Sequence, residues 1–253
     1  SMMNSGVLKE IVQKHEEMKT MLRNDQEEKP RGLPPLVLVT TRRALANTKL
    51  LQGDYEGAFK LLAEAETTLE SLPDSPATLR ETGMVLQVRV KLKIVTGEYV
   101  EALRILNNAM GLMLLHGTTA QLAEIWRLHG EVYLRQNNFK QATNALNQCL
   151  ELAEQDENNV ETAYCRHLQG LLMWKMGDLD EAERLLNLSI EIGGLLPELV
   201  EHLPVIQLDL AKVLQAKGKT AGVSRILDDI EAVHTGKENA EMLQEIKRIR
   251  KQL

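Results

Sequence analysis

One short pattern returns five times along the 253-residue chain at nearly constant spacing. It reads Gly or Asn, a polar residue, usually an aromatic residue or Leu, two further residues, and usually Ala. The first residues of the five copies are Gly53, Gly97, Asn137, Gly177 and Gly218, and successive copies start 44, 40, 40 and 41 residues apart. Recurrence at roughly 20 to 50 residues is typical of a stack of similar units, so we expect a repeat architecture rather than one compact core.

Each element of the pattern has a physical reason. Gly, or Asn as its usual substitute, ends a helix in the left-handed conformation that residues with a Cβ resist. An Asp or Asn just after it, as in Asp54 and Asn138, can cap the following helix. The aromatic residue anchors that second helix, and we expect the Ala to be small because two helices cross closely there.

Apolar residues at helical spacing flank each turn on both sides, over runs of about 15 residues that are too long for strands. Aromatic residues make up only 3% of the chain, which suits helices that interlock through Leu, Ala, Met and Ile. An extra turn is expected within 195–203. The predicted helices pair as 36–52 with 55–71, 77–96 with 99–115, 119–136 with 139–155, 160–176 with 179–192, and 204–217 with 220–233.

The third unit resembles the tetratricopeptide repeat. It has Trp126, Gly130, Tyr133, Asn137, Phe139 and Ala142 at the offsets where that family shows Trp, Gly, Tyr, Gly, Tyr and Ala. The first and second units depart from the family, with Ala46 and Val90 at the inner Gly position. The spacing of about 41 residues exceeds the family's usual 34 or so and is similar to the longer variants of kinesin light chains, Pins-like spindle adaptors and maltose-activator-type regulators. The resemblance covers roughly residues 36–235 and implies a fold, not a partner.

The sequence therefore predicts an all-α, right-handed α-solenoid (TPR-like) of five helical hairpins over residues 36–236. Residues 1–25 are expected to hold an amphipathic helix, with an apolar face of Val7, Leu8, Ile11, Val12, Met18 and Leu22. A polar linker is expected at 26–35. Residues 237–253 are expected to form a capping helix, because the last repeat of a solenoid otherwise exposes an apolar face.

Catalytic and cofactor motifs are not found. Gly218-Lys219-Thr220 resembles the end of a phosphate-binding loop, but the required earlier glycine is replaced by Val213, and the triplet falls in a repeat turn. The histidines show no metal-ligand spacing. We therefore expect no enzyme activity, no catalytic residues, no cofactor and no metal.

The net charge of −6 gives no reason to expect nucleic acid, and no apolar stretch reaches the length of a membrane span. Cys149 and Cys165 are the only cysteines. They read as small buried hydrophobic residues in a reducing compartment rather than as a disulfide. The expected location is intracellular, either cytoplasmic or nuclear.

In the tetratricopeptide fold the first helices of successive repeats line a concave groove. Counting back from each turn, we expect its exposed positions to include Arg43, Asn47, Gln87, Lys91, Arg127, Glu131, Tyr164, His167, Leu171 and Trp174. For Tyr164 and Trp174 the competing role is packing between repeats. For Arg43 and Arg127 the competing role is that of an ordinary solvated charge. The carboxylate clamp of chaperone-binding members is incomplete: Arg43 and Asn47 match, but Val88, Glu124 and Leu128 occupy the later positions.

These features favour a non-catalytic protein–protein interaction scaffold or adaptor, a subunit of a larger assembly, that holds a peptide or helix of a partner in the groove. The alternative is a regulatory domain that senses a ligand or peptide. Self-association through the N-terminal helix is a further possibility.

Overall fold

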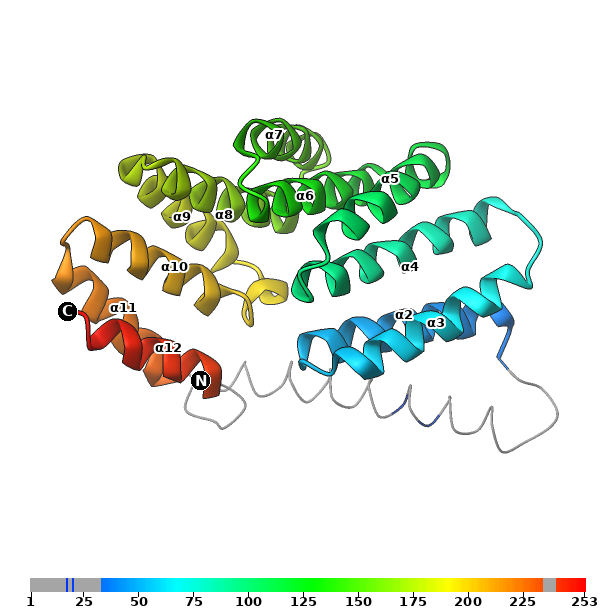
Figure 1. The fold of residues 1–253 in the computed structure, drawn as a ribbon, viewed down its shortest axis with the longest axis horizontal. Helices are drawn as coiled ribbons and strands as arrows, with labels where there is room; N and C mark the ends of the chain where they lie inside the picture. Colours follow the sequence, from blue (N-terminus) through cyan, green and yellow to red (C-terminus); the bar gives the residue numbers. More distant parts are fainter. Residues whose placement is uncertain (1–16, 18–19, 21–32, 234–239) are drawn as a thin grey trace. The chain divides into compact units, whose positions relative to one another are not determined.

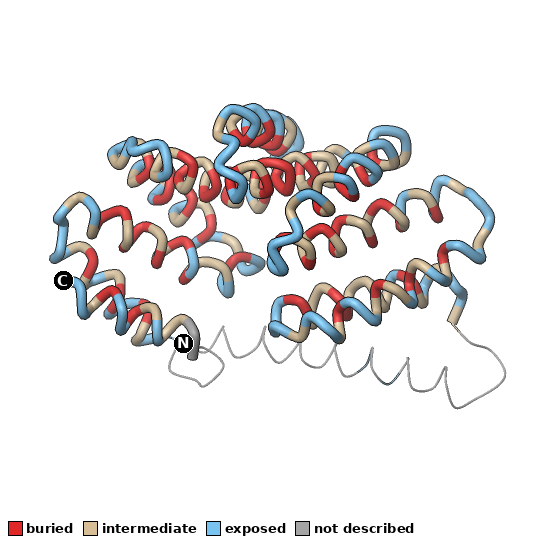
Figure 2. The backbone as a smooth tube through the Cα atoms, in the orientation of Figure 1, coloured by how far each residue is buried: buried red, intermediate tan, exposed pale blue. Residues whose placement is uncertain are grey.

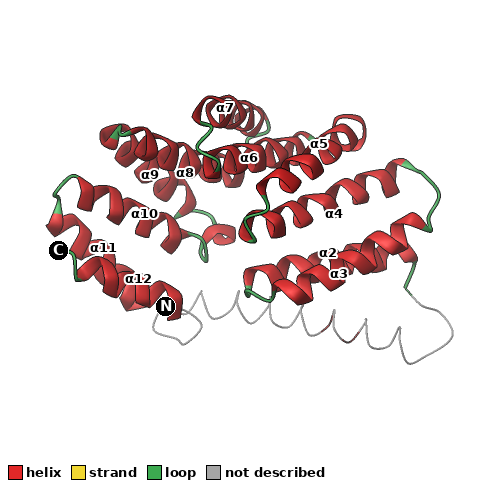
Figure 3. Ribbon diagram, viewed as in Figure 1, coloured by secondary structure: helices red, strands yellow, loops and turns green. Residues whose placement is uncertain are grey.

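The computed structural model describes residues 17, 20, 33–233 and 240–253, and every regular element in that part of the chain is helical (Figure 3). The all-α solenoid of helical hairpins is confirmed, and each of the ten paired helices begins and ends within one residue of its predicted position. The hairpins (Figure 1) are α2 (Pro35–Leu51) with α3 (Tyr55–Glu70), α4 (Pro76–Val95) with α5 (Tyr99–His116), α6 (Thr119–Arg135) with α7 (Phe139–Gln155), α8 (Asn159–Met176) with α9 (Leu179–Gly193), and α10 (Leu203–Ala216) with α11 (Thr220–Val233). We call the first helix of each hairpin its A helix and the second its B helix.

Two shorter elements complete the description. The extra turn expected before the last hairpin is the 3-10 helix η1 (Pro197–Leu199), and a C-terminal helix, α12, runs over Ala240–Arg250. The amphipathic helix expected in residues 1–25 lies almost wholly outside the described residues. It stays a prediction, as does self-association through it.

The chain divides into two compact units, an N-terminal unit up to Gln121 and a C-terminal unit from Leu122 onward. In the N-terminal unit, α2 packs on α3 and α4 packs on α5, while α4 also contacts α2 and α3. In the C-terminal unit, α8 contacts α7 and α9, and α10 contacts α8, α9 and α11. Figure 2 shows buried positions recurring along the helices of each unit.

The repeat turns have the backbone expected from the sequence. The residue that opens the pattern has a positive φ in all five copies: Gly53 (77°), Gly97 (78°), Asn137 (57°), Gly177 (90°) and Gly218 (72°). Asp54 accepts a hydrogen bond from the Gly57 amide at 2.9 Å and so caps α3. The backbone amide of Asp54 in turn bonds the Lys49 carbonyl at 2.9 Å, which ends α2. The result is a tight helix–turn–helix hairpin. Backbone amide and carbonyl groups that a helix leaves unpaired at its ends find hydrogen-bond partners in this turn.

The small residues of the pattern lie where two helices cross. Ala58, Ala102, Ala142 and Ala182 are fully buried. The inner glycines of the third and fourth hairpins are equally constrained: a Cβ at Gly130 would lie 2.6 Å from Leu146 Cδ2, and one at Gly170 would lie 2.7 Å from Leu186 Cγ. The A and B helices of these hairpins approach each other closely because no side chain separates them.

Candidate functional site

A salt bridge joins the two A helices of the N-terminal unit. Arg43 Nε on α2 donates to Glu81 Oε1 on α4 at 2.6 Å, and both side chains are largely buried. Further along α4, Gln87 is only 4% exposed and its amide donates to the Gln121 carbonyl at 3.2 Å. Asn47 and Lys91, the other two predicted groove residues of this unit, are half-buried. Of the four predicted positions, Arg43 and Gln87 therefore direct their polar groups to neighbouring parts of the chain rather than outward.

The same kind of pair occurs in the C-terminal unit. Arg127 Nε on α6 donates to Glu161 Oε2 on α8 at 2.8 Å, and its guanidinium lies over the ring of Tyr164 at 4.8 Å from the centroid. Burial opposes the charge on Arg127, but the carboxylates of Glu161 and Glu124 more than offset it, so the pKa of Arg127 is raised. Burial also raises the pKa of Tyr164. Arg127 is 9% exposed and is thus held inside the A-helix layer.

A histidine relay connects α8 to α10. His167 Nε2 donates to Asp209 Oδ2 at 2.8 Å, and His202 Nε2 lies 3.3 Å from His167 Nδ1. The ring of His202, at the start of α10, also lies 4.8 Å from the ring of Tyr164. Burial, with the nearby His167 and Arg127, lowers the pKa of His202 to about 4. The neutral form of His202 is the one that fits this crowded site.

The remaining predicted groove residues of the C-terminal unit present less enclosed side chains. Tyr164, Leu171 and Trp174 are half-buried along α8, at spacings of seven and three residues that share one helix face. Trp174 packs against the C-terminal core and Leu171 against the core of the middle hairpins. Glu131 on α6 is half-buried and lies 3.5 Å from Arg135. We call the surface formed by the predicted groove residues of the A helices the A-helix face. The sequence predicts that its later part is aromatic and apolar, and the structure places Tyr164, Leu171 and Trp174 on one side of α8.

Several residues that shape this face were missed by the sequence reading. Glu81, Glu161 and Asp209 each lie on the A helix that follows their basic partner, 38, 34 and 42 residues along the chain. One repeat length separates the members of each pair. A search for opposite charges at that spacing would have found them.

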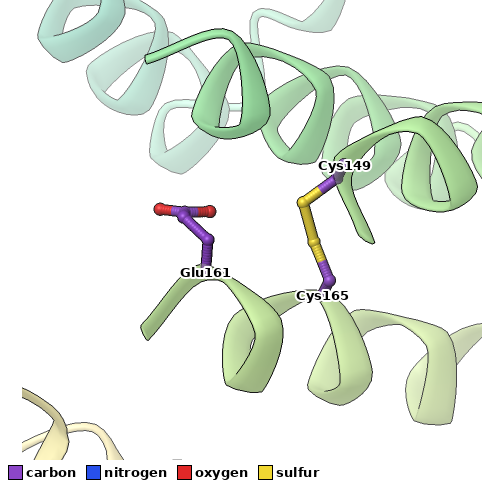
Figure 4. A group of neighbouring side chains, drawn as sticks. All are labelled: Cys149, Glu161 and Cys165. Carbon is purple, nitrogen blue, oxygen red and sulfur yellow. A yellow bond between two sulfur atoms is a disulfide. The ribbon is translucent and has the colours of Figure 1, made fainter. Parts of the chain in front are cut away.

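The cysteine prediction is wrong in one respect. Cys149 on α7 and Cys165 on α8 are fully buried, as expected, but they form a disulfide, with Cα atoms 6.6 Å apart (Figure 4). The two cysteines are 16 residues apart in sequence, and the turn between the two packed helices brings their side chains face to face. The expectation of a reducing compartment loses its support, since it rests on unpaired thiols.

Glu161 lies near this disulfide, and the ligand atoms of Cys149, Glu161 and Cys165 fall within 4.8 Å of one another (Figure 4). A disulfide offers no thiolate to a metal. The Glu161 carboxylate also already accepts from Arg127. The three side chains therefore act as structural links between helices in this state of the chain.

Family models for the tetratricopeptide repeat match residues 91–155 and 163–187. The matched segments are similar to tetratricopeptide repeats and lie within the hairpins formed by α4 to α9. None of the helices in the described residues has the length and apolar character needed to cross a bilayer.

Solved structures share the fold at low sequence identity. BtubC (BKLC) from P. vanneervenii is 18% identical, with a TM-score of 0.61 over 94% of this chain and 91% of that one. A Rap protein complexed with Competence and Sporulation Factor is 16% identical, with a TM-score of 0.69 over 86% of this chain and 59% of that one. A thermophilic TPR protein of Thermus thermophilus is 17% identical, with a TM-score of 0.59 over 85% of this chain and 98% of that one. No curated protein sequence matches the chain significantly.

Proposed function

We propose that the chain is a non-catalytic scaffold or adaptor that holds a peptide or helix of a partner protein against its A helices, as a subunit of a larger assembly. The observation that carries this proposal is the row of Tyr164, Leu171 and Trp174 on one face of α8, each half-buried and none enclosed. Aromatic residues at such positions are the commonest anchors of protein interfaces. Tetratricopeptide repeats are generally a non-catalytic fold for protein interaction.

The ten groove residues then divide into two roles. Arg43, Gln87, Arg127 and His167 bond to neighbouring helices and hold the face rigid. We propose that the partner contacts Glu131, Tyr164, Leu171 and Trp174 on the C-terminal unit. On the N-terminal unit, taken by itself, Asn47 and Lys91 are the proposed contact residues. A preorganised face loses less conformational entropy on binding than a mobile one, so the internal bonds support partner binding without touching the partner.

Affinity purification with partner identification by mass spectrometry tests the proposal. The full chain is compared with a variant carrying Leu171→Asp and Trp174→Ala. A control carries Val100→Ala and Leu115→Asp, since Val100 and Leu115 are exposed apolar residues on the B helix α5. We expect the first variant to lose partners that the wild type and the control both retain. Equal recovery of partner proteins by all three chains would contradict partner binding at the A-helix face.

The second candidate is a domain that senses a small ligand or peptide. It is favoured by the likeness in fold to a Rap protein whose structure was solved with Competence and Sporulation Factor. Thermal unfolding across a panel of metabolites and short peptides separates the two functions. A sensor is stabilised increasingly as the concentration of its ligand rises above the Kd, whereas a scaffold responds only to its protein partner.

A further inference from the structure

Three buried side chains with metal-binding atoms converge between α7 and α8. The sulfurs of Cys149 and Cys165 and a carboxylate oxygen of Glu161 lie within 4.8 Å of one another, and all three residues are at most 8% exposed (Figure 4). Glu161 and Cys165 are four residues apart on α8, which places them on one helix face, and Cys149 meets them from α7. We call these three residues the sulfur–carboxylate cluster. The sequence expectation of no metal rests on the histidines, which this cluster does not include.

Reduction of the disulfide turns the cluster into a set of metal ligands. A dithiol reductant supplies two electrons and two protons, so the bond between the sulfurs breaks, two thiols form, and the reductant itself becomes a disulfide. Because α7 and α8 pack on each other beyond this bond, the thiols stay beside Glu161. The Cα atoms of the two cysteines are 6.6 Å apart, near the upper end of the roughly 4.4 to 6.8 Å that disulfides span. Two bonds of about 2.3 Å from the sulfurs to one metal ion bridge such a separation without drawing the helices together.

The charges around the cluster favour a cation between the sulfurs. Arg127 Nε donates to Glu161 Oε2 at 2.8 Å, and another nitrogen of the same guanidinium lies 3.5 Å from Glu124 Oε1. This guanidinium already faces two carboxylates, so it does not also balance two buried thiolates, and unpaired buried charge is costly. A divalent ion supplies the missing positive charge. The hydrogen bond from Arg127 uses Oε2 of Glu161, so Oε1 can bind the ion, and ligating carboxylates commonly keep such an outer partner.

We propose that the reduced cluster binds one zinc ion through Cys149, Cys165 and Glu161, and that this ion joins α7 to α8 in place of the disulfide. Thiolates select against hard cations such as Mg²⁺ and Ca²⁺, and zinc accepts sulfur together with a carboxylate oxygen in a tetrahedral set. Three side chains leave the fourth position to a water molecule, which enters from the exposed turn over residues 154–157, just before α8. Each thiol releases its proton to solvent as it binds the ion.

Titration of the full chain with Co²⁺, which takes the place of zinc and absorbs characteristically when bound to thiolates, tests the site. The chain is reduced, freed of reductant and kept from air, and it is compared with the oxidised chain and with the variants Cys149→Ser and Glu161→Gln. The matched control is Glu81→Gln. Glu81 and Glu161 are both 8% exposed, and each accepts a hydrogen bond from an arginine of the preceding A helix. Both variants therefore lose the same kind of ion pair, but only Glu161→Gln loses a proposed metal ligand.

We expect the reduced wild type to bind one Co²⁺ with thiolate-to-metal absorption, and Zn²⁺ to displace it because zinc binds such sites more tightly. The oxidised chain and Cys149→Ser should lack this absorption. Glu161→Gln should weaken Co²⁺ binding at least about tenfold, whereas Glu81→Gln should leave it unchanged. Zn²⁺ should also raise the Tm of the reduced wild type and not that of Cys149→Ser, a readout that does not require Glu161→Gln to fold.

Two results would overturn the zinc site. The first is a reduced wild type without thiolate-to-metal absorption or without a rise in Tm on adding Zn²⁺. The second is equal Co²⁺ affinity in Glu161→Gln and Glu81→Gln, which would leave a pair of cysteines without the carboxylate. Neither result bears on partner binding at the A-helix face, because the proposed zinc site does not depend on that function.

Discussion

The guanidinium of Arg127 on α6 donates to the carboxylate of Glu161 on α8 at 2.8 Å, with both side chains about nine-tenths buried. Arg43 and Glu81 form the corresponding pair between α2 and α4 in the N-terminal unit. In each unit an arginine of one A helix thus reaches an acid near the start of the next. Such pairs set the register of successive repeats, because a shifted register would bury both charges unpaired.

Removing one partner of this pair should be more damaging than removing both. Arg127→Met leaves the Glu161 carboxylate buried without a cation, and we expect a loss of about 3 kcal/mol in the free energy of unfolding. The double variant Arg127→Met, Glu161→Leu should recover most of that loss. Urea unfolding of the single and double variants measures the coupling. Additive losses would show that the two side chains do not depend on each other.

Acidification should weaken the joint between α8 and α10 through His202. Its pKa falls from 6.5 to about 4 in the folded chain, so the unfolded chain takes up a proton first as the pH drops below 6.5. Stability is therefore full above that pH and declines towards pH 4, by roughly 2 to 3 kcal/mol. His129, whose pKa is lowered by burial, adds a change of the same sign.

Urea unfolding at pH 7 and pH 5 measures this effect. His202→Gln should flatten the pH dependence, whereas His116→Gln, in the N-terminal unit, should leave it unchanged. Identical pH profiles for wild type and His202→Gln would show that the relay of His202, His167 and Asp209 does not govern the acid response.

Reduction should destabilise the chain through the disulfide between α7 and α8. Cys149 and Cys165 close a short loop, 16 residues apart, and a bond across a loop of that length contributes about 3 kcal/mol. A reductant should therefore lower the urea midpoint of the wild type, and the Cys149→Ala, Cys165→Ala variant should not respond to it. An equal fall in the urea midpoint of both proteins would show that the reductant does not act through this disulfide.

Two glycine substitutions should have opposite effects. Gly111 lies in the interior of α5, is exposed and has open space around its Cα, so Gly111→Ala should stabilise the chain by about 0.5 to 1 kcal/mol. Gly170→Ala places a Cβ 2.7 Å from Leu186 Cγ and should cost about 1 to 3 kcal/mol through overpacking. Thermal unfolding of both variants checks the signs. Stabilisation by Gly170→Ala would mean that α8 and α9 can separate without loss.

The hairpins were predictable because their signals are local. A turn such as Gly53-Asp54 specifies its own backbone through a positive φ and a capping side chain. The spacing of apolar residues on either side of the turn can be recognised within a single helix. The inner Gly170 likewise marks a close crossing within one hairpin. Such features do not depend on how distant parts of the chain meet.

The roles of the groove residues were less predictable because they depend on contacts between repeats. Gln87, Arg127 and His167 fall at outward positions of their own helices, yet each is buried by a neighbouring element. Which acid pairs with Arg127, and that Cys149 meets Cys165, follow from the stacking of helices rather than from spacing within one.

Hydrogen–deuterium exchange of the full chain with and without its purified partner tests the central claim most directly. We predict slower exchange in peptides from the A helices α8 and α10, around Tyr164, Leu171 and Trp174, with the B helices α9 and α11 unchanged. Protection confined to the B helices, with α8 and α10 unaffected, would contradict the assignment of the A-helix face as the partner-binding surface.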